Sequence, residues 1–223
     1  MANYKNLIPF IKQAEGGLSK ATTDTASAHP VPDGSGYHTN KGITWQTWSG
    51  VFGSSPDSIQ RFYAMSNEDW GTIYKKYYWD SVMADNIQSQ RVADTLVNWV
   101  WSSGQYTPVS KLQKIVGVPA DGAFGNHTLQ AVNSADESSL YDQLKTTAYN
   151  WFSALGDESK FAANKTGWLN RLTNLANYVE SSVESGVASV ENTAKQNPVK
   201  LVIAIALLGI GLAVVIQVIR IVH

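Results

Sequence analysis

Residues 7–17 have the sequence LIPFIKQAEGG, in which apolar side chains recur at helical spacing up to a carboxylate and two glycines. Positions 7, 8, 10, 11 and 14 share one face of such a helix. Asn6 can cap its start, Pro9 fits its first turn, and Gly16 is a natural stop. The pattern therefore predicts a helix whose last turn contains Glu15. The negative end of the helix dipole lies there and favours a protonated carboxyl group, as a general acid requires.

Composition limits the classes of function. The chain has 223 residues, 43% of them hydrophobic and 16% charged, which is enough for one or two compact domains. Its formal net charge of −1 and the lack of a basic stripe argue against nucleic acid as a partner. Cysteine is absent, and the histidines at 29, 38, 127 and 223 lack the spacing of metal ligands. We therefore predict no metal site and no nucleic-acid partner.

An apolar segment over residues 201–219 has the sequence LVIAIALLGIGLAVVIQVI. At about 1.5 Å per residue, a helix of this length spans about 28 Å, close to the hydrocarbon thickness of a bilayer. Lys200 and Arg220 flank the segment, as residues at a membrane interface do. The N-terminal residues contain no signal-peptide core of sufficient length. We therefore predict a single-pass membrane protein, anchored in a lipid bilayer through residues 199–221.

Two further stretches have their own patterns. Residues 18–40 show neither helical nor strand periodicity and are rich in Ser, Thr, Gly, Pro and Asp, which predicts a long functional loop. Valines at 179, 183, 187 and 190 recur every three or four residues. This spacing predicts a thin amphipathic helix that ends near Pro198 and acts as a stalk.

The EGG at residues 15–17, the Asp/Pro/Gly-rich loop after it and the TNKGIT at residues 39–44 together resemble glycoside hydrolase family 108. This family comprises bacterial and phage N-acetylmuramidases with a lysozyme-like fold. Residues 73–80, IYKKYYWD, resemble the family's helix that ends in an aromatic cluster. Residues 92–101, VADTLVNWVW, resemble its buried central helix.

The resemblance implies hydrolysis of the β-1,4 bond between N-acetylmuramic acid and N-acetylglucosamine in bacterial peptidoglycan, with Glu15 as general acid and no cofactor. Such a reaction needs a protonated carboxyl at the leaving oxygen and a base or nucleophile on the opposite face. Asp24 is the favoured second catalytic group, because its distance from Glu15 in sequence matches that between the catalytic Glu and Asp of phage-type lysozymes. Asp33 lies in a Pro-Asp-Gly turn and is less favoured. Thr39 or Thr44 could instead hold the attacking water.

Five residues in the matching segments are candidates for binding the substrate: Thr39, Asn40, Thr44, Tyr78 and Trp79. Helical spacing alone places positions 70, 73, 74 and 77 on one face, which predicts core packing for them. Trp79 lies at the helix end, where an accessible ring would suit a sugar face.

The second half of the chain is predicted to be helical. Residues 108–133 form a helix that stops at Gly117, a turn at Asp121-Gly122 and a second helix. They resemble the small peptidoglycan-binding units that accompany family 108 domains. Residues 138–178 have the periodicity of two more helices.

These features together predict a mostly α protein with a lysozyme-like helical domain. Residues 1–88 form the catalytic region, 89–178 the peptidoglycan-binding region, 179–198 the stalk and 199–221 the transmembrane helix. The setting that fits a tail-anchored wall hydrolase is a phage or viral lysin. It would lie in a virion internal membrane or the host inner membrane, where virion or membrane proteins are further candidate partners.

Two alternatives remain open. One is a non-catalytic, membrane-anchored virion structural or wall-binding protein on a lysozyme-like scaffold. Asn98 and Trp101 favour it, since the family has Asp and Asn at these positions. The other is a lytic transglycosylase that uses the same Glu15 and releases anhydro-sugars.

Overall fold

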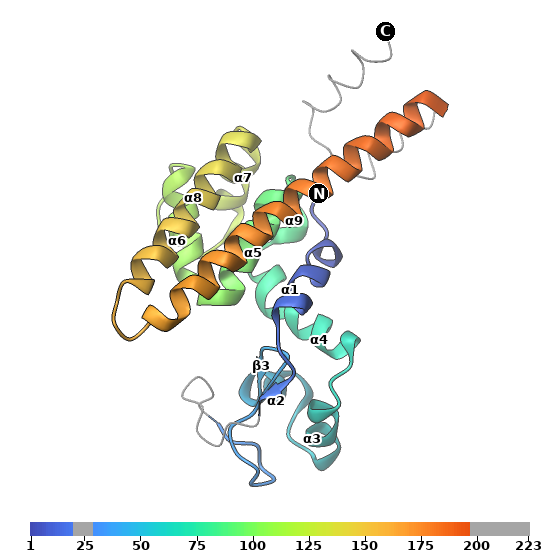
Figure 1. Cartoon of the computed structure of the whole chain (residues 1–223), viewed down its shortest axis with the longest axis vertical. Coiled ribbons are helices and arrows are strands. Elements are labelled where there is room, and N and C mark those ends of the chain that lie inside the picture. Colours follow the sequence, from blue (N-terminus) through green and yellow to red (C-terminus); the bar gives the residue numbers. More distant parts are fainter. Residues whose placement is uncertain (20–28, 197–223) are drawn as a thin grey trace. The chain divides into compact units, whose positions relative to one another are not determined.

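The computed structural model describes residues 1–19 and 29–196, and these are mostly helical, as predicted (Figure 1). The chain divides into two compact units. The sheet unit comprises Lys5–Asp80, and the bundle unit comprises Met1–Tyr4 with the chain from Ser81 onward. The sequence places a functional boundary at residue 88, whereas the compact units divide at residue 80.

The sheet unit combines short helices with a small antiparallel sheet. Its helices are α1 (Ile8–Ala14), α2 (Trp45–Phe52), α3 (Pro56–Tyr63) and α4 (Asn67–Tyr74), which continues as a π-helix over Lys75–Trp79. Its strands are β1 (Leu18–Ser19), β2 (Thr39–Asn40) and β3 (Ile43–Thr44), with β2 in the middle. The expectation of loop throughout 18–40 is therefore corrected at both ends, where two-residue strands pair with each other.

Polar caps determine where most helices of the sheet unit begin. Thr44, Ser55 and Ser66 precede α2, α3 and α4, and each side-chain oxygen accepts a hydrogen bond from the backbone N–H three residues on. Asp69 completes a capping box, because its carboxylate accepts from the N–H of Ser66 at 3.2 Å.

The start of α1 differs from the prediction. Its N-cap is Leu7, which makes no side-chain capping bond, whereas Asn6 belongs to a preceding 3₁₀ turn, so the predicted cap is wrong. Pro9 lies in the first turn as expected, where its missing N–H costs nothing.

Aromatic rings fill the core of the sheet unit. Phe62 packs edge-on against Trp45 and Trp48, at centroid distances of 5.3 and 5.7 Å. The indole nitrogen of Trp48 donates to the hydroxyl of Ser58 at 3.0 Å, so its polar atom is satisfied inside the core. These contacts hold α2 and α3 together.

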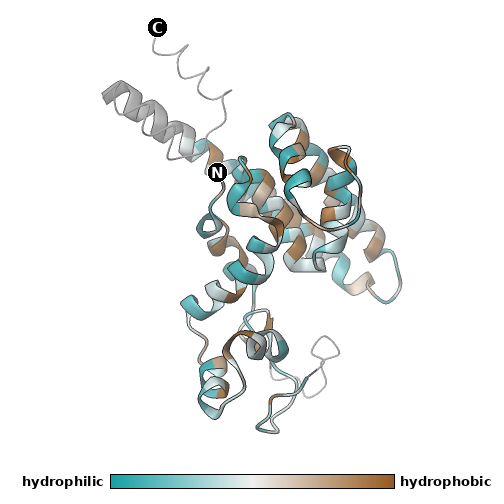
Figure 2. Cartoon of the chain, turned by 180° about the vertical axis from the view of Figure 1, so that it is seen from behind, coloured by the Kyte–Doolittle hydropathy of each residue, from teal (hydrophilic) through white to brown (hydrophobic). Residues whose placement is uncertain are grey.

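In its described residues, the bundle unit consists of helices and the turns and loops that connect them. Its α-helices are α5 (Gln90–Ser103), α6 (Tyr106–Ile115), α7 (Asn126–Ser134), α8 (Glu137–Gly156) and α9 (Lys165–Gln196). Its 3₁₀ turns cover Ala84–Asn86 and Ala162–Asn164, and two more, Tyr4–Asn6 and Asp80–Val82, lie where the chain passes from one unit to the other. Nine consecutive residues of α5, from Val92 to Val100, are buried, which confirms the predicted central helix. The other helices of this unit carry both hydrophilic and hydrophobic residues around their axes, as amphipathic helices do (Figure 2).

The buried side-chain amide of Gln113 stabilises the connection between α6 and α7. Gly117, at a φ of 73°, ends α6 as predicted. The Gln113 Nε2 donates to the carboxylate of Asp121 at 2.8 Å, and its Oε1 accepts from the N–H of Gly122 at 2.9 Å. Asp121 also accepts from the N–H of Ala123 at 2.9 Å, which is the predicted turn.

α9 is one continuous helix of 32 residues, so the predicted stalk is not a separate element. Val179 is 2% exposed and still packs in the bundle, whereas Val183 is 39% exposed. The packed part of α9 therefore ends between these two valines, and the helix continues beyond it to Gln196.

No helix within residues 1–19 and 29–196 is both long and apolar enough to cross a bilayer. The predicted anchor, residues 199–221, lies outside the described residues.

Asp94 is a buried carboxyl group in α5. It is 3% exposed, and its carboxylate accepts from Nε2 of Gln90 at 2.7 Å. Gln90 in turn accepts from the N–H of Asn3 at 2.8 Å, which ties the N-terminal residues to α5. Burial removes water from the charged form and raises the pKa of Asp94 to about 8, from 3.8 for the exposed group.

The free energy of unfolding of the bundle unit should therefore fall as the pH rises from about 4 to about 8. Over this range the unfolded chain loses the Asp94 proton while the folded chain keeps it, which costs at most about 1.4 kcal/mol per pH unit. Asp94→Asn should flatten this dependence, because the amide cannot ionise and still accepts from Gln90. Urea unfolding at pH 5 and pH 8 measures it.

Asp136→Asn is the matched control, since Asp136 is exposed and Asn caps α8 equally well. This variant should keep the wild-type pH dependence. Equal slopes for wild type and Asp94→Asn would contradict the prediction.

Candidate active site

Glu15 lies where α1 ends and the sheet begins. Its backbone is extended (φ −94°, ψ 134°), and its N–H donates to the carbonyl of Ile11 at 3.1 Å. It is therefore the C-cap residue of α1 rather than a member of its last turn. Leu7 and Ile11 are fully buried and anchor α1, while the side chain of Glu15 is half-buried. A carboxylate that is partly accessible is thus held at the end of a fixed element.

The turn between β2 and β3 is the tight two-residue type. Lys41 and Gly42 both have positive φ, at 48° and 77°. This combination is a type I′ turn, whose twist matches that of the strands it joins. Glycine adopts the conformation without cost, but Lys41 needs support from its surroundings to keep it.

The alternation of side chains gives the sheet two different faces. Paired positions on the inner face are Leu18, Asn40 and Ile43, and those on the outer face are Ser19, Thr39 and Thr44. Thr39 and Thr44 are direct cross-strand partners, so the structure brings together both threonines predicted to hold water or substrate. Thr44 also caps α2 by accepting from the N–H of Thr47 at 3.2 Å.

Asn40 belongs to the inner face and supports the hairpin. It is 3% exposed, and its Nδ2 donates to the carbonyls of Phe62 at 2.7 Å and Tyr63 at 3.2 Å. Its amide therefore satisfies the end of α3, where carbonyls lack helical partners. The substrate contact predicted for Asn40 stays a prediction, and its position in the structure is that of a support.

A column of aromatic rings runs along α4 and into the π-helix. Trp70 and Tyr74 are fully buried, which confirms the predicted core packing, and their rings stack at 5.0 Å. Tyr78 continues the column at 6.2 Å from Tyr74. At its other end, the indole N–H of Trp70 donates to the carbonyl of Lys41 at 3.0 Å, which supports the strained turn.

Tyr78 connects this column to Glu15. Burial raises the pKa of Tyr78, and the negative charge of Glu15 raises it further, which requires the two side chains to be close in space. Tyr78 is half-buried, so part of its surface remains accessible. Tyr78 is thus a predicted aromatic contact whose pKa responds to the charge of Glu15.

Two aromatic residues of the same helix differ from expectation. Trp79 is fully buried, so the accessible ring predicted at the helix end is wrong. Tyr77 is 39% exposed and does not share the core face with Trp70 and Tyr74. The backbone widens to a π-helix over Lys75–Trp79, and there Tyr78, rather than Tyr77, stacks over Tyr74.

Asp24 and Asp33 are the two carboxylates considered for the second catalytic group, and the structure describes only Asp33. Asp24 lies outside the described residues. Asp33 accepts from the N–H of Ser35 at 2.9 Å and from the hydroxyl of Tyr63 at 2.8 Å, inside a turn closed by the bridge between Val31 and Gly36. Hydrogen bonds from Ser35 are the main cause that lowers the pKa of Asp33. Asp33 is thus a turn residue, and the link to Tyr63 is one that sequence spacing did not indicate.

Metal binding finds no support in the described part of the chain. Residues 1–19 and 29–196 contain no group of three or more His, Cys, Asp or Glu side chains that could hold a metal ion. The described part of the site offers the carboxyl group of Glu15, the phenol of Tyr78 and the polar outer face of the sheet.

Residues 8–104 match the family Glycosyl hydrolase 108. Residues 107–173, which begin at α6, match the family described as Predicted Peptidoglycan domain. The resemblance of both segments is confirmed, and the two matches support a glycoside hydrolase that acts on peptidoglycan.

A solved structure, that of SagA from Brucella abortus, is similar to this chain. The two sequences are 25% identical, and the match covers 79% of this chain and 93% of that one with a TM-score of 0.62. No curated protein matches the chain.

Asn40→Ala should destabilise the sheet unit by about 1–3 kcal/mol, because it leaves buried carbonyls of α3 without a donor. Urea unfolding followed by tryptophan fluorescence measures this loss. Thr39→Ala is the matched control, since Thr39 is its half-buried neighbour on the outer face, and should change stability by less than about 0.5 kcal/mol. Equal effects of the two substitutions would show that the amide does not support the hairpin.

Proposed function

We propose that this protein, whose residues 8–104 match the glycosyl hydrolase 108 family, is an N-acetylmuramidase. It hydrolyses the β-1,4 bond between N-acetylmuramic acid and N-acetylglucosamine in bacterial peptidoglycan, with Glu15 as general acid. The observation that carries the proposal is the position of Glu15, half-buried at the junction of α1 and the sheet and close to Tyr78. The family match supplies the substrate class.

The geometry supports a division of roles around Glu15. A protonated carboxyl there would donate to the leaving oxygen, as glycoside hydrolysis requires. The hydroxyls of Thr39 and Thr44 on the outer face of the sheet are candidates to position water or sugar hydroxyls. Asp24 is our candidate for the second catalytic group, which would act as base or nucleophile on the opposite face of the sugar.

Glu15→Gln should abolish wall cleavage, with a loss of at least about 100-fold, because the amide cannot give a proton to the leaving oxygen. Turbidity loss of purified peptidoglycan measures the rate, and the appearance of new reducing ends identifies hydrolysis. Glu68→Gln makes the same change at an exposed residue of α4 and should leave the rate unchanged.

The products distinguish the proposal from its alternatives. Anhydro-sugar ends in place of reducing ends would identify a lytic transglycosylase. Binding to peptidoglycan without cleavage, in a folded wild-type protein, would identify a non-catalytic wall-binding protein. Asn98, where the family has Asp, gives little support to a non-catalytic protein. Its Oδ1 accepts a hydrogen bond from Nε of Arg171 at 3.1 Å, so the residue stabilises the bundle.

We further propose that residues 199–221 anchor the enzyme in a bilayer, in a phage or viral setting such as a virion internal membrane or the host inner membrane. The proposal rests on the apolar sequence of residues 201–219 and its basic flanks. Other virion or membrane proteins at that membrane remain candidate partners.

The full chain should float with liposomes in a density gradient and resist extraction at high pH, because an apolar helix of this length partitions into the bilayer. A chain that ends at Gln196, where the described helix α9 ends, should stay at the bottom of the gradient. Flotation of both chains to the same extent would contradict the anchor.

A further inference from the structure

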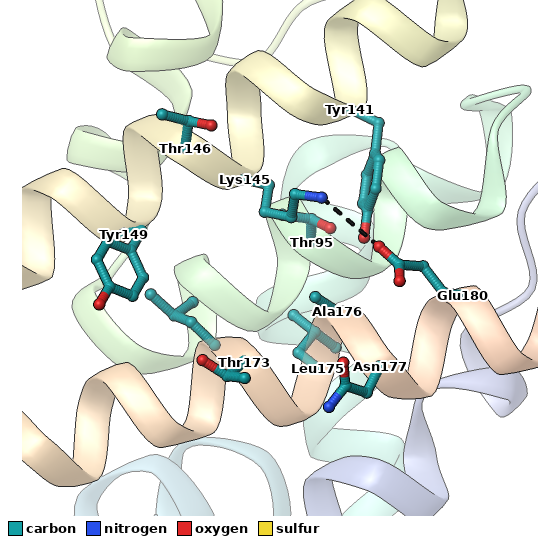
Figure 3. A pocket seen from close by; sticks show the side chains of 11 residues that line it. Thr95, Tyr141, Lys145, Thr146, Tyr149, Thr173, Leu175, Ala176, Asn177 and Glu180 are labelled. Atoms are coloured by element: carbon teal, nitrogen blue, oxygen red, sulfur yellow. Dashed lines mark ion pairs between the residues drawn. The ribbon is translucent and has the colours of Figure 1, made fainter.

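The bundle unit contains a cavity of about 310 Å³ between α5, α8 and α9 (Figure 3). This volume lies at the lower end of the range for small-ligand sites. Much of its lining belongs to the segment that matches the peptidoglycan domain, including Tyr141, Lys145 and Leu172. The cavity has no part in the site around Glu15, which lies in the sheet unit.

One cation and one anion lie together at the edge of this cavity. Nζ of Lys145, from α8, is 3.5 Å from Oε1 of Glu180, from α9 (Figure 3). The same ammonium group is 3.3 Å from Asp142. Both members of the Lys145–Glu180 pair are partly exposed, at 36% and 52%, so the pair is weak and can open at little cost.

A buried hydroxyl lies next to this ion pair. Tyr141 is 2% exposed, and its ring is covered by Arg91 and Lys145, each 4.7 Å from its centroid. Its hydroxyl has no hydrogen-bond partner within the described residues. Burial raises the pKa of Tyr141, so the group stays a phenol and can donate. A buried hydroxyl without a partner is unfavourable unless a ligand or water satisfies it.

Part of the cavity lining, here called the apolar wall, consists of apolar side chains. Leu172, Leu175 and Ala176 line it from α9, and the first two are buried. A ligand that fits both parts has a short aliphatic body and carries an ammonium and a carboxylate at one end. Its carboxylate would pair with Lys145 and its ammonium group with Glu180, in place of the Lys145–Glu180 ion pair. Its aliphatic chain would pack against the apolar wall.

We propose that this cavity binds the zwitterionic amino-acid arm of a peptidoglycan stem peptide. Its carboxylate pairs with Lys145 and accepts from the Tyr141 hydroxyl, while its ammonium group pairs with Glu180. This inference rests on one part of the proposed function, namely that the protein acts on peptidoglycan. It names the part of the wall that the bundle unit recognises.

The charges distinguish the stem peptide from the glycan. The sugar rings of peptidoglycan carry no ammonium group, and the lactyl carboxyl of a substituted N-acetylmuramic acid is consumed in the amide bond to the peptide. Uncharged polar side chains also line the cavity, namely Thr95, Thr146, Tyr149, Thr173 and Asn177. The feature that complements a zwitterion rather than a neutral sugar is the Lys145–Glu180 ion pair. The peptide is the component of the wall that complements such a lining.

The test uses the full chain in detergent and isothermal titration calorimetry. The probe is the tripeptide L-Ala-γ-D-Glu-meso-diaminopimelate, whose third side chain ends in an amine and a carboxylate. Two comparison ligands are the same peptide with norleucine in the third position and the disaccharide of N-acetylglucosamine. We expect the diaminopimelate peptide to bind at least about tenfold more tightly than either, since each charged contact is worth about that factor.

Variants locate the binding to the cavity. Lys145→Gln, Glu180→Gln and Tyr141→Phe should each weaken peptide binding, the first two by about tenfold. Lys114→Gln and Glu184→Gln make the same changes at exposed residues that do not line the cavity and should leave the affinity unchanged. Unfolding curves of all five variants report their folding, and Tyr141→Phe removes only a hydroxyl, so it keeps the inference testable if a charge variant is unstable.

Three results would overturn the inference: no peptide binding at millimolar concentration, equal affinity in the cavity variants, or tighter binding of the disaccharide or of the norleucine peptide. The proposed enzyme is judged separately by the cleavage assay on the same preparation. Wall cleavage without peptide binding would contradict only the binding of the stem peptide in this cavity. Peptide binding without cleavage would contradict only the proposed enzymatic activity.

Discussion

The hydrogen bond from the indole of Trp70 to the carbonyl of Lys41 is the contact on which the candidate active site depends. Lys41 has a left-handed backbone that a lysine adopts only at a cost, and the tight turn exists because α4 supplies a donor to it. The same tryptophan begins the stack that continues through Tyr74 to Tyr78. One column of rings therefore links the polar hairpin to the residue beside Glu15.

Side-chain amides have a comparable task at two other places. Asn40 closes the end of α3 with its Nδ2, and Gln113 joins both sides of the α6–α7 connection through its Nε2 and Oε1. Both residues are buried, so an apolar replacement would leave backbone or carboxylate groups without partners. Such buried polar contacts specify one arrangement of short elements whose hydrophobic faces alone would tolerate several.

Sequence patterns predicted the elements that carry strong local signals. The end of α1 near Glu15, the burial of α5 and the stop at Gly117 follow from helical spacing and from glycine conformation. The strands β1 and β2 were not predicted, since two residues are too few to show alternation. The burial of Trp79 and the inward position of Asn40 were also missed, because both depend on contacts with elements distant in sequence.

The long helix was predicted in pieces for a related reason. Valines at every third or fourth position look the same whether they pack on a bundle or follow it, so the sequence could not show that α9 continues without a break. Beyond Val179 it extends as one rod to Gln196, about 25 Å at the usual helical rise. Such a rod sets direction as well as distance. Each inserted residue would turn whatever follows Gln196 by about 100° around the helix axis, and seven would nearly restore its orientation while adding about 10 Å. Length variation in this segment should therefore be tolerated in whole helical periods rather than residue by residue.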